Sequence, residues 1–413
     1  MSSSTMFIMS LLFFVPVANG DDKKILPADA GVPVIDWKDA AKYMDKEVIV
    51  QGTIAETGRS RTMSFLNFDR SRSFTAIVRK RNYSNFPKQP TFLYGHKVVR
   101  IHGVISQYKG KPQIELSSPD QITVLTKEEP IPAAPPPASH PFNGIAKVGC
   151  YNVLNLFDDY DDPYHPDEGT DPKPREALEK LAQTIRKADA DVLALEEVEN
   201  RDYLERFVRA MLPDMGYQNV VCIESNDRRG IDCAVLSRFP VGPVTSYRHV
   251  LFSDGSGGMM RFRRDLLRVR IEPPDAPSFD VFAVHFKSKG GGGDTERIRS
   301  AECRQARKIL DGLLEKDKGA RFIICGDFND TWNSKPLKIL RGTGPKELVA
   351  FLDDLPKNTV TFNKEPYRSV IDFILCSPAM AKRYVSKSYS VLDGTVDSSG
   401  SDHNPVLIQF RLK

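Results

Sequence analysis

The last two thirds of the chain alternate short apolar runs with segments of helical periodicity. Apolar runs of strand length occupy residues 191–195, 219–223, 233–236, 266–271, 281–284, 322–325 and 406–408. Apolar residues at helical spacing precede two of these runs, namely Leu178, Leu181, Ala182 and Ile185, and Ala306, Ile309, Leu310 and Leu313. Because several strands also follow one another without a helix, the pattern predicts an α/β fold in which a two-sheet β-sandwich is flanked by helices. We assign this domain to residues 145–413.

Residues 34–127 have a different pattern. Asp36 is placed to cap a short helix, and strand-like runs follow at residues 48–50, 65–68, 74–78, 98–101 and 114–116. Turn residues such as Gly58 and Gly110 separate these runs, which predicts a small all-β barrel. Residues 46–52, 95–103 and 111–116 resemble the oligonucleotide/oligosaccharide-binding (OB) fold.

Two further segments lie outside these domains. Residues 128–143 are rich in proline and predict an extended linker. The apolar stretch at residues 6–17 is too short to span a bilayer, and small residues follow it. We therefore predict that residues 1–20 are a cleaved signal peptide, and that the protein is secreted or periplasmic without stable membrane insertion. A mis-assigned start or a retained anchor is the alternative, because no Lys or Arg precedes the apolar stretch.

The 413 residues have a globular composition, with 40% hydrophobic and 27% charged residues, but the charge is uneven. From Gln51 to Gln113 there are 12 Lys and Arg against 2 acidic residues. Aromatic residues are interleaved with them: Phe65, Phe68, Phe74, Tyr83, Phe86, Tyr94 and Tyr108. Single-strand binders use this combination for phosphate attraction and base stacking, so a nucleic-acid partner is expected. Some of these rings must form the barrel core, and a solvated charged face is the simpler alternative.

The six cysteines all lie after the linker and match no zinc-binding spacing. Five of them stand in apolar runs and are interpreted as small core residues. Cys222 and Cys233 could face each other across a hairpin and form a disulfide in an exported protein. The sequence leaves both interpretations open.

Polar residues stand at the ends of the predicted strands, where side chains from different strands can meet in a cleft. In chain order they are Asn152, Glu196, Glu197, His285, Asp327, Asn329, Asp372, Asp402 and His403. Carboxylates are hard ligands for a divalent cation, an amide can orient a phosphate, and a His–Asp pair can handle a proton. Together these groups predict metal-assisted phosphodiester hydrolysis.

In this order the residues resemble the endonuclease/exonuclease/phosphatase superfamily, the fold of pancreatic deoxyribonuclease. Residues 152–158 and 285–289 are similar to strings in secreted bacterial nucleases of that superfamily, several of which carry an OB-like domain. The resemblance implies that Glu197, rather than Glu196, binds a catalytic Mg²⁺ or Mn²⁺ ion, with Asp402 near the metal. Ca²⁺ in a structural role is a candidate for the acidic loop that follows Leu156, although a solvated loop is the simpler interpretation.

The resemblance also implies roles for the remaining residues. Asp327 would orient or deprotonate the attacking water, while Asn152 and Asn329 would hold the phosphate and Asp327 in place. His403 would stabilise the transition state, and Asp372 would orient His403 through its other ring nitrogen.

A second histidine completes the implied site. His285 is the candidate general acid for the leaving oxygen. Asp232 is the candidate carboxylate partner of His285, although the sequence around Asp232 matches the family motif only loosely.

The sequence therefore predicts an exported, monomeric, metal-dependent nuclease that hydrolyses DNA, RNA or both. The first alternative is an enzyme of the same fold that acts on phospholipid, inositol phosphate or another small phosphoester. Such a lipid-active enzyme would need an exposed apolar hairpin near the cleft, for which residues 251–260 are the candidate. A non-enzymatic scaffold is the second alternative, but it would have no use for these polar residues together.

Overall fold

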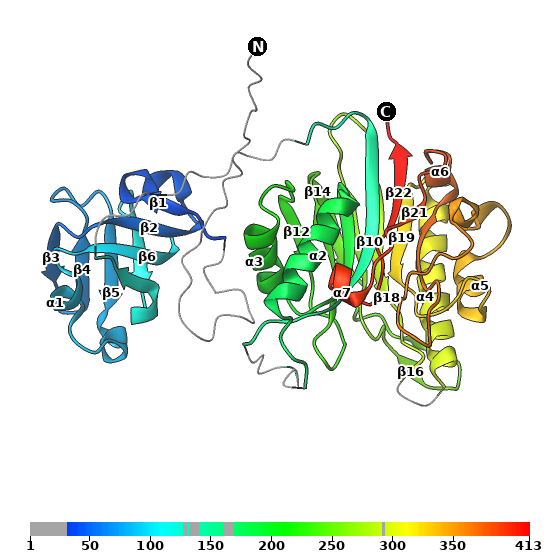
Figure 1. Ribbon diagram of the computed structural model, residues 1–413, viewed down its shortest axis with the longest axis horizontal. Coiled ribbons are helices and arrows are strands. Elements are labelled where there is room, and N and C mark those ends of the chain that lie inside the picture. Colours follow the sequence, from blue (N-terminus) through cyan, green and yellow to red (C-terminus); the bar gives the residue numbers. More distant parts are fainter. Residues whose placement is uncertain (1–30, 127–130, 132–139, 161–164, 166–168, 291–293) are drawn as a thin grey trace, which may run out of the picture.

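The computed structural model describes residues 31–126, 131, 140–160, 165, 169–290 and 294–413. The predicted signal peptide and most of the predicted linker lie outside these residues. A small N-terminal β domain and a larger α/β domain are apparent in Figure 1. Among the described helices, none combines the length and apolarity that crossing a bilayer requires.

The N-terminal domain is a barrel of short strands. Its elements are β1 (Val34–Asp36), β2 (Glu47–Thr53), β3 (Glu56–Arg59), β4 (Met63–Asn67), β5 (Thr75–Arg79), α1 (Pro90–Tyr94), β6 (Val98–Val104), β7 (Ser106–Tyr108), β8 (Lys111–Leu116) and β9 (Ile122–Val124). One sheet has the order β3-β4-β5-β8-β7, and β2 pairs with β6 in the other. Because β2 leads almost directly into β3, and β6 into β7, two bent strands link both sheets into one barrel.

The core of the barrel shows which of the seven interleaved aromatic residues are structural. Four of them are buried in it: Phe68, Phe74, Phe86 and Tyr94. Phe65 and Tyr83 are half-buried, whereas the side chain of Tyr108 is 60% exposed. Of the seven, Tyr108 is thus the ring most available for stacking on a ligand.

Residues 145–413 form two sheets, with strand orders β12-β13-β11-β10-β22-β21 and β14-β17-β18-β19-β20. The strands are β10 (Ile145–Leu156), β11 (Val192–Val198), β12 (Asn219–Cys222), β13 (Asp232–Ser237), β14 (Val241–Ser246), β17 (Leu266–Ile271), β18 (Phe279–His285), β19 (Phe322–Asp327), β20 (Asp372–Cys376), β21 (Ser390–Val391) and β22 (Val406–Arg411). A separate hairpin consists of β15 (Phe252–Ser253) and β16 (Met259–Met260).

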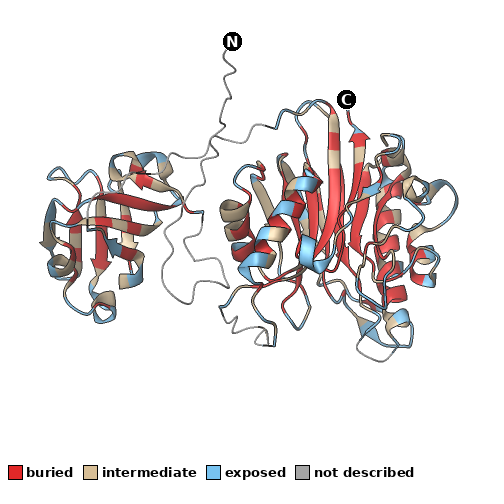
Figure 2. Ribbon diagram, viewed as in Figure 1, coloured by how far each residue is buried: buried red, intermediate tan, exposed pale blue. Residues whose placement is uncertain are grey.

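The two sheets pack face to face and helices cover their outer sides, which confirms the predicted α/β sandwich. The helices are α2 (Arg175–Ala188), α3 (Arg201–Met211), α4 (Thr295–Lys316), α5 (Lys335–Arg341), α6 (Pro378–Ala381) and α7 (Val396–Ser399). Helices α2 and α3 share a core with the six-stranded sheet, and α4 and α5 share one with the five-stranded sheet. In α2 the buried residues include Leu178, Leu181 and Ile185, at the predicted spacing. Figure 2 shows buried strands between helices that are partly exposed.

The six cysteines all lie in the described residues of this domain, and all are free. Cys222 lies opposite Ala234 across β12 and β13, and Cys233 points into the core between the sheets, so the alternative of a disulfide is not realised.

Near the N-terminal end of the larger domain, Phe142 packs on Phe239 with ring centroids 5.1 Å apart. The end of the predicted linker therefore belongs to the larger domain.

Candidate active site

Strand pairing aligns the predicted polar residues at one edge of the two sheets. His285 at the end of β18 pairs with Asp327 at the end of β19, which in turn pairs with Asp372 at the start of β20. In the other sheet, Asn152 of β10 pairs with Glu196 of β11. The polar strand ends that the sequence predicts are thus brought to neighbouring positions by the register of the sheets.

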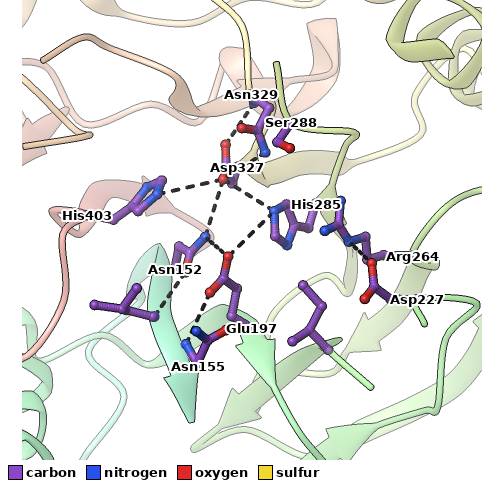
Figure 3. A network of polar contacts seen from close by, with 12 residues as sticks. Asn152, Asn155, Glu197, Asp227, Arg264, His285, Ser288, Asp327, Asn329 and His403 are labelled. Carbon is purple, nitrogen blue, oxygen red and sulfur yellow. Dashed lines mark hydrogen bonds and ion pairs between the residues drawn. The ribbon is translucent and has the colours of Figure 1, made fainter. Parts of the chain in front are cut away.

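The carboxylate of Asp327 is the centre of the resulting network (Figure 3). Its Oδ2 accepts hydrogen bonds from Asn152 Nδ2 at 3.3 Å and from Asn329 Nδ2 at 3.1 Å. The Nε2 atoms of His285 and His403 lie 3.5 and 3.8 Å from the same oxygen. Its Oδ1 accepts the backbone N–H of Asn329 at 2.8 Å. Two amides and two imidazoles therefore surround one buried carboxylate.

The position of Asp327 changes its acidity. Burial raises the pKa of Asp327 to about 7, with the charge of Asp372 adding to the effect and His403 opposing it. A carboxylate with a near-neutral pKa accepts a proton more readily than an ordinary aspartate, which is the property a general base needs.

His403 and Asp372 form a tightly held pair. His403 Nδ1 lies 3.0 Å from both carboxylate oxygens of Asp372, which fixes a proton on Nδ1 and turns Nε2 towards Asp327. The backbone N–H of Asp372 donates to Thr361 Oγ1 at 3.0 Å, so the backbone that carries this carboxylate is anchored. Burial opposes the charged ring, but Asp372 and Asp327 together raise the pKa of His403 to about 10. His403 is therefore a cationic donor at neutral pH.

The two adjacent glutamates of β11 have different surroundings. Glu196 is fully buried, neither of its carboxylate oxygens has a hydrogen-bond partner among the described residues, and burial raises its pKa well above the ordinary value. The side chain of Glu197 is 15% exposed, and it accepts hydrogen bonds from Asn152 Nδ2 at 3.3 Å and from the backbone N–H of Asn155 at 3.1 Å. Glu197 has a φ of +65°, a left-handed conformation that is strained for a residue with a side chain. Of the two, Glu197 is the one that faces the network.

The expected pair of Asp232 and His285 is not formed. Asp232 accepts a hydrogen bond from the backbone N–H of Ser225 at 2.8 Å, and Cys222 Sγ lies 3.8 Å from it. His285 Nδ1 is buried and has no hydrogen-bond partner in the described part of the chain, while its Nε2 faces Asp327 and Glu197. The reason is that β13 begins at Asp232 beside a loop that supplies its own donors, so the carboxylate is satisfied locally.

The charge state of His285 follows from this environment. Burial lowers its pKa well below the ordinary value, and Arg264 and His403 lower it further. An imidazole in such a place is neutral at physiological pH, so its surroundings favour a hydrogen-bonding role over delivery of a proton.

Four carboxylates and one imidazole could hold a cation. Asp327, Asp372 and His403 have ligand atoms within 4.8 Å of one another, but the Nδ1 atom of His403 is already bonded to Asp372. Asp402 is 7% exposed, burial raises its pKa, His403 opposes that rise and the charge of Glu197 adds to it. The charges of Asp372 and Glu197 add to the rise in the pKa of Asp327, and a hard divalent cation would offset this concentration of negative charge.

Sequence reasoning missed a lysine behind the site. Lys173 is 5% exposed and donates from Nζ to the backbone oxygen of Leu154 at 2.7 Å. Leu154 and Asn155 have φ values of +50° and +52°, and the pairing of β10 is irregular at this point. The bulge gives Asn155 the orientation in which its N–H reaches Glu197. The sequence does not indicate this bulge, because leucine rarely adopts the left-handed backbone conformation that it requires.

Basic side chains flank the network on two sides. The charges of Arg264, Arg229 and Lys287 act on His285, and that of Lys364 acts on Asp402. Arg229 and Lys364 are exposed, whereas Arg264 is buried in an ion pair with Asp227 at 2.8 Å. The site therefore lies within the electrostatic reach of several basic side chains, which favours an anionic ligand.

A sandwich of two sheets with this constellation at one edge defines a hydrolase of phosphoesters. A model of the endonuclease/exonuclease/phosphatase family matches residues 147–396, which is more than half of the chain. The protein belongs to this family. No curated protein matches the sequence.

The chain is similar to several solved structures. The human Nocturnin catalytic domain with bound sulfate anion is 20% identical, with 66% of this chain and 96% of that chain covered and a TM-score of 0.48. An endonuclease/exonuclease/phosphatase from Beutenbergia cavernae is 20% identical, with coverage of 65% and 72% and a TM-score of 0.45. A mannosyl-6-phosphatase from Bacteroides thetaiotaomicron is 18% identical, with coverage of 64% and 98% and a TM-score of 0.45.

Proposed function

We propose that the protein is an exported, metal-dependent phosphodiesterase that cleaves nucleic acids. The observation that carries the proposal is the convergence of three different groups on one point. An accessible carboxylate (Glu197), a buried carboxylate of raised pKa (Asp327) and a cationic imidazole (His403) all lie within reach of the amide of Asn152 or of one another. The apolar stretch and small residues at the N-terminus support export.

Glu197 and Asp402 are the groups that would hold a Mg²⁺ or Mn²⁺ ion. Both offer oxygen ligands, and neither carboxylate forms an ion pair with Lys or Arg among the described residues. When bound, the cation would supply Lewis-acid stabilisation of negative charge on the phosphate.

The chain's own residues act on the attacking water and on the phosphate, and the leaving oxygen takes its proton from solvent as its bond to phosphorus breaks. Asp327 accepts the proton of the attacking water, since its raised pKa suits a base, and the amides of Asn152 and Asn329 hold its carboxylate in place. His403 donates from Nε2 to a phosphate oxygen on which charge develops, while Asp372 maintains its charge and orientation. Neutral His285 positions the phosphate by a hydrogen bond.

The basic barrel supports a nucleic acid as the substrate. The order of its paired strands supports the OB assignment, because β5 lies parallel to β8. OB domains bind ligands beside two turns, which correspond here to the turns between β3 and β4 and between β7 and β8. Arg59 and Arg61 are exposed at the first turn, and Tyr108, Lys109 and Lys111 at the second. A second binding site on the same chain raises the local concentration of substrate at the catalytic site.

A substrate panel tests the proposal. Full-length protein is incubated with Mg²⁺ or Mn²⁺ and with plasmid DNA, single-stranded DNA, RNA, phospholipid vesicles or inositol phosphates, with and without a chelator. We expect chelator-sensitive cleavage of at least one nucleic acid. Turnover of lipid or a small phosphoester alone would refute the assignment of substrate while leaving the class of enzyme intact.

One observation favours lipid as the second candidate. Leu251 and Met259, in and beside the hairpin of β15 and β16, are 54% and 64% exposed. Phe252, the aromatic residue of the same hairpin, is buried and packs on Phe262 with ring centroids 4.9 Å apart. An anchor of two aliphatic side chains without an exposed aromatic ring is small, and the basic groups around the site fit a polyanion better.

A further inference from the structure

Helix α4 carries charged side chains on its buried face. Arg299 is 3% exposed, Glu302 is 1% exposed and Arg307 is 9% exposed, in a helix face otherwise made of residues such as Cys303 and Leu310. A buried charge is costly unless it is paired or hydrogen-bonded, so the partners of these side chains show what the charges stabilise.

Glu302 binds two backbone segments at once. One carboxylate oxygen accepts the N–H of Arg263 at 2.9 Å, and the other accepts the N–H of Lys287 at 2.9 Å. Arg263 lies just before β17 and next to Arg264, while Lys287 lies two residues after His285. The carboxylate therefore ties the loop that follows β18 to the loop that precedes β17.

Arg299 binds the other side of the same loop. Its Nη1 donates to the backbone oxygen of Lys287 at 3.0 Å, and its Nε lies 3.0 Å from Asp330 Oδ2. Asp330 also pairs with Lys289 Nζ at 3.0 Å. Lys287 is thus held through its N–H by Glu302 and through its carbonyl by Arg299, while Asp330 extends the contact to the loop after β19.

The loops after β18 and β19 begin directly after His285 and Asp327, which are proposed to act in the reaction. Asn329 Nδ2 donates to the backbone oxygen of Phe286 at 3.0 Å, and the N–H of Phe286 donates to the backbone oxygen of Asp327 at 3.0 Å. A continuous chain of hydrogen bonds therefore runs from α4 through residues 286 and 287 to Asn329 and Asp327.

We infer that Arg299 and Glu302 are positioning residues for phosphodiester hydrolysis, and that α4 fixes the mutual geometry of His285, Asp327 and Asn329. The inference rests on the phosphodiesterase activity proposed above, but not on nucleic acid as the substrate. If α4 only had to be stable, apolar residues on its buried face would be enough. Instead, two buried charges on this face bind three loops at the catalytic edge.

Arg307 provides a matched control on the same helix. It is also buried and also bonds a carboxylate, Asp311, together with backbone oxygens of Arg341 at 2.9 Å and Lys346 at 3.0 Å. Asp311 lies one turn further along α4, and the backbone partners belong to α5 and the segment that follows it. Loss of Arg307 removes the same kind of interaction without touching the loops after β18 and β19.

The test compares R299A, R299K and E302Q with R307A in full-length protein, with bis(4-nitrophenyl) phosphate and Mn²⁺ as the probe. We expect kcat to fall about 10- to 100-fold in R299A with KM little changed, and to recover in part when guanidinium is added at a non-denaturing concentration. R299K and E302Q should lose less activity than R299A. R307A should show a similar drop in melting temperature and a kcat near that of the wild type. Equal losses of kcat in R299A and R307A, or no loss in R299A, would overturn the inference.

A second measurement does not need activity. Amide hydrogen exchange of residues 286–289 and 328–331 should become faster in R299A and stay unchanged in R307A, because Arg299, unlike Arg307, bonds these loops. If the wild type cleaves no phosphodiester, the proposed function fails while this measurement still decides the structural inference. Unchanged exchange in R299A would refute it.

Discussion

Asp372 shows how a single charge organises its neighbours at the scale of one residue. It lies 2% exposed, bonds His403 Nδ1 through both oxygens and raises the pKa of His403 and of Asp327. In water such effects are small, but in a buried site they decide which group holds a proton.

We predict that D372N reduces kcat by about 10²- to 10⁴-fold, since the amide cannot sustain the charged form of His403. The measurement is metal-dependent hydrolysis of a small phosphodiester at neutral pH. D280N is the matched control, because Asp280 is also buried and paired, with Arg268 at 2.7 Å, but near the opposite end of β18. A comparable loss of kcat in D280N would contradict the role of Asp372.

Asp232 leads to a prediction about stability. Burial raises its pKa from an ordinary value of 3.8 to about 7. The folded protein therefore keeps a proton that the unfolded chain releases, so the free energy of unfolding falls as the pH rises from 3.8 to about 7. In D232N this loss is absent. We expect the variant to gain about 2 kcal/mol relative to the wild type between about pH 5 and about pH 8, as measured by urea denaturation at both values. A constant difference at the two pH values would show that Asp232 titrates normally.

Most residues of the network were predictable because polar groups at the ends of apolar strands have few structural reasons to be there. Asp327, Asn329 and His403 are of this kind. Asp232 was expected to pair with His285 only through the resemblance, at a position where the family motif is loose, and only three-dimensional contacts show that Ser225 satisfies it. Lys173 could not be found, since its partner is a backbone oxygen in a bulge.

At the scale of elements, β19 depends on the glycine that precedes Asp327. Gly326 has a φ of +134°, and a Cβ atom there would lie 2.1 Å from the backbone oxygen of Val284 and 2.6 Å from Glu196 Oε1. The close approach of β18 and β19 at this point sets the place of Asp327.

We predict that G326A lowers the free energy of unfolding by about 3 kcal/mol or more and removes activity, because neither the strand nor the buried Glu196 has room to move. G312A is the control. Gly312 lies inside α4, and a Cβ atom added there would meet no described atom within 4 Å. Alanine at this position should therefore add up to about 1 kcal/mol. Denaturant unfolding of both variants gives the measurement, and a G326A protein as stable as the wild type would contradict the prediction.

The strands and helices of the larger domain followed from periodicity, since one apolar face per element is enough to specify them. The helix of Leu178, Leu181 and Ile185 is an example. What periodicity could not show is the charge buried on α4, because Arg299 and Glu302 in a helix are ordinarily assigned to its exposed face.

At the scale of the whole molecule, two domains divide the proposed work. Glu47 of the barrel pairs with Arg209 of α3 at 3.2 Å, a partly exposed contact worth about 1 kcal/mol or less. Composition and the proline-rich segment predict a division into two domains. The sequence could not show which aromatic residues are buried in the barrel core, because alternation along a strand does not say which face is the core.

We predict that replacing Arg59 and Arg61 with alanine weakens binding of nucleic acid. The slope of log affinity against log salt should fall by about 1 for each phosphate that the variant no longer neutralises. Hydrolysis of a small phosphodiester should be unchanged. K42A is the control, because Lys42 is an exposed barrel cation already paired with Asp39 at 2.7 Å. Equal weakening in K42A would mean that net charge alone, and not the β3–β4 turn, binds the ligand.

We propose that Glu197, and not Glu196, holds the catalytic cation beside Asp327 and His403. The most direct measurement is the rate of Mg²⁺- or Mn²⁺-dependent nucleic-acid cleavage by E197Q and E196Q, each compared with the wild type over a titration of the metal. We expect a loss of at least about 100-fold in E197Q and activity near that of the wild type in E196Q, because Glu196 is fully buried, burial raises its pKa and its carboxyl lies away from solvent. Equal rates in the two variants, or cleavage that persists in a chelator, would contradict this proposal.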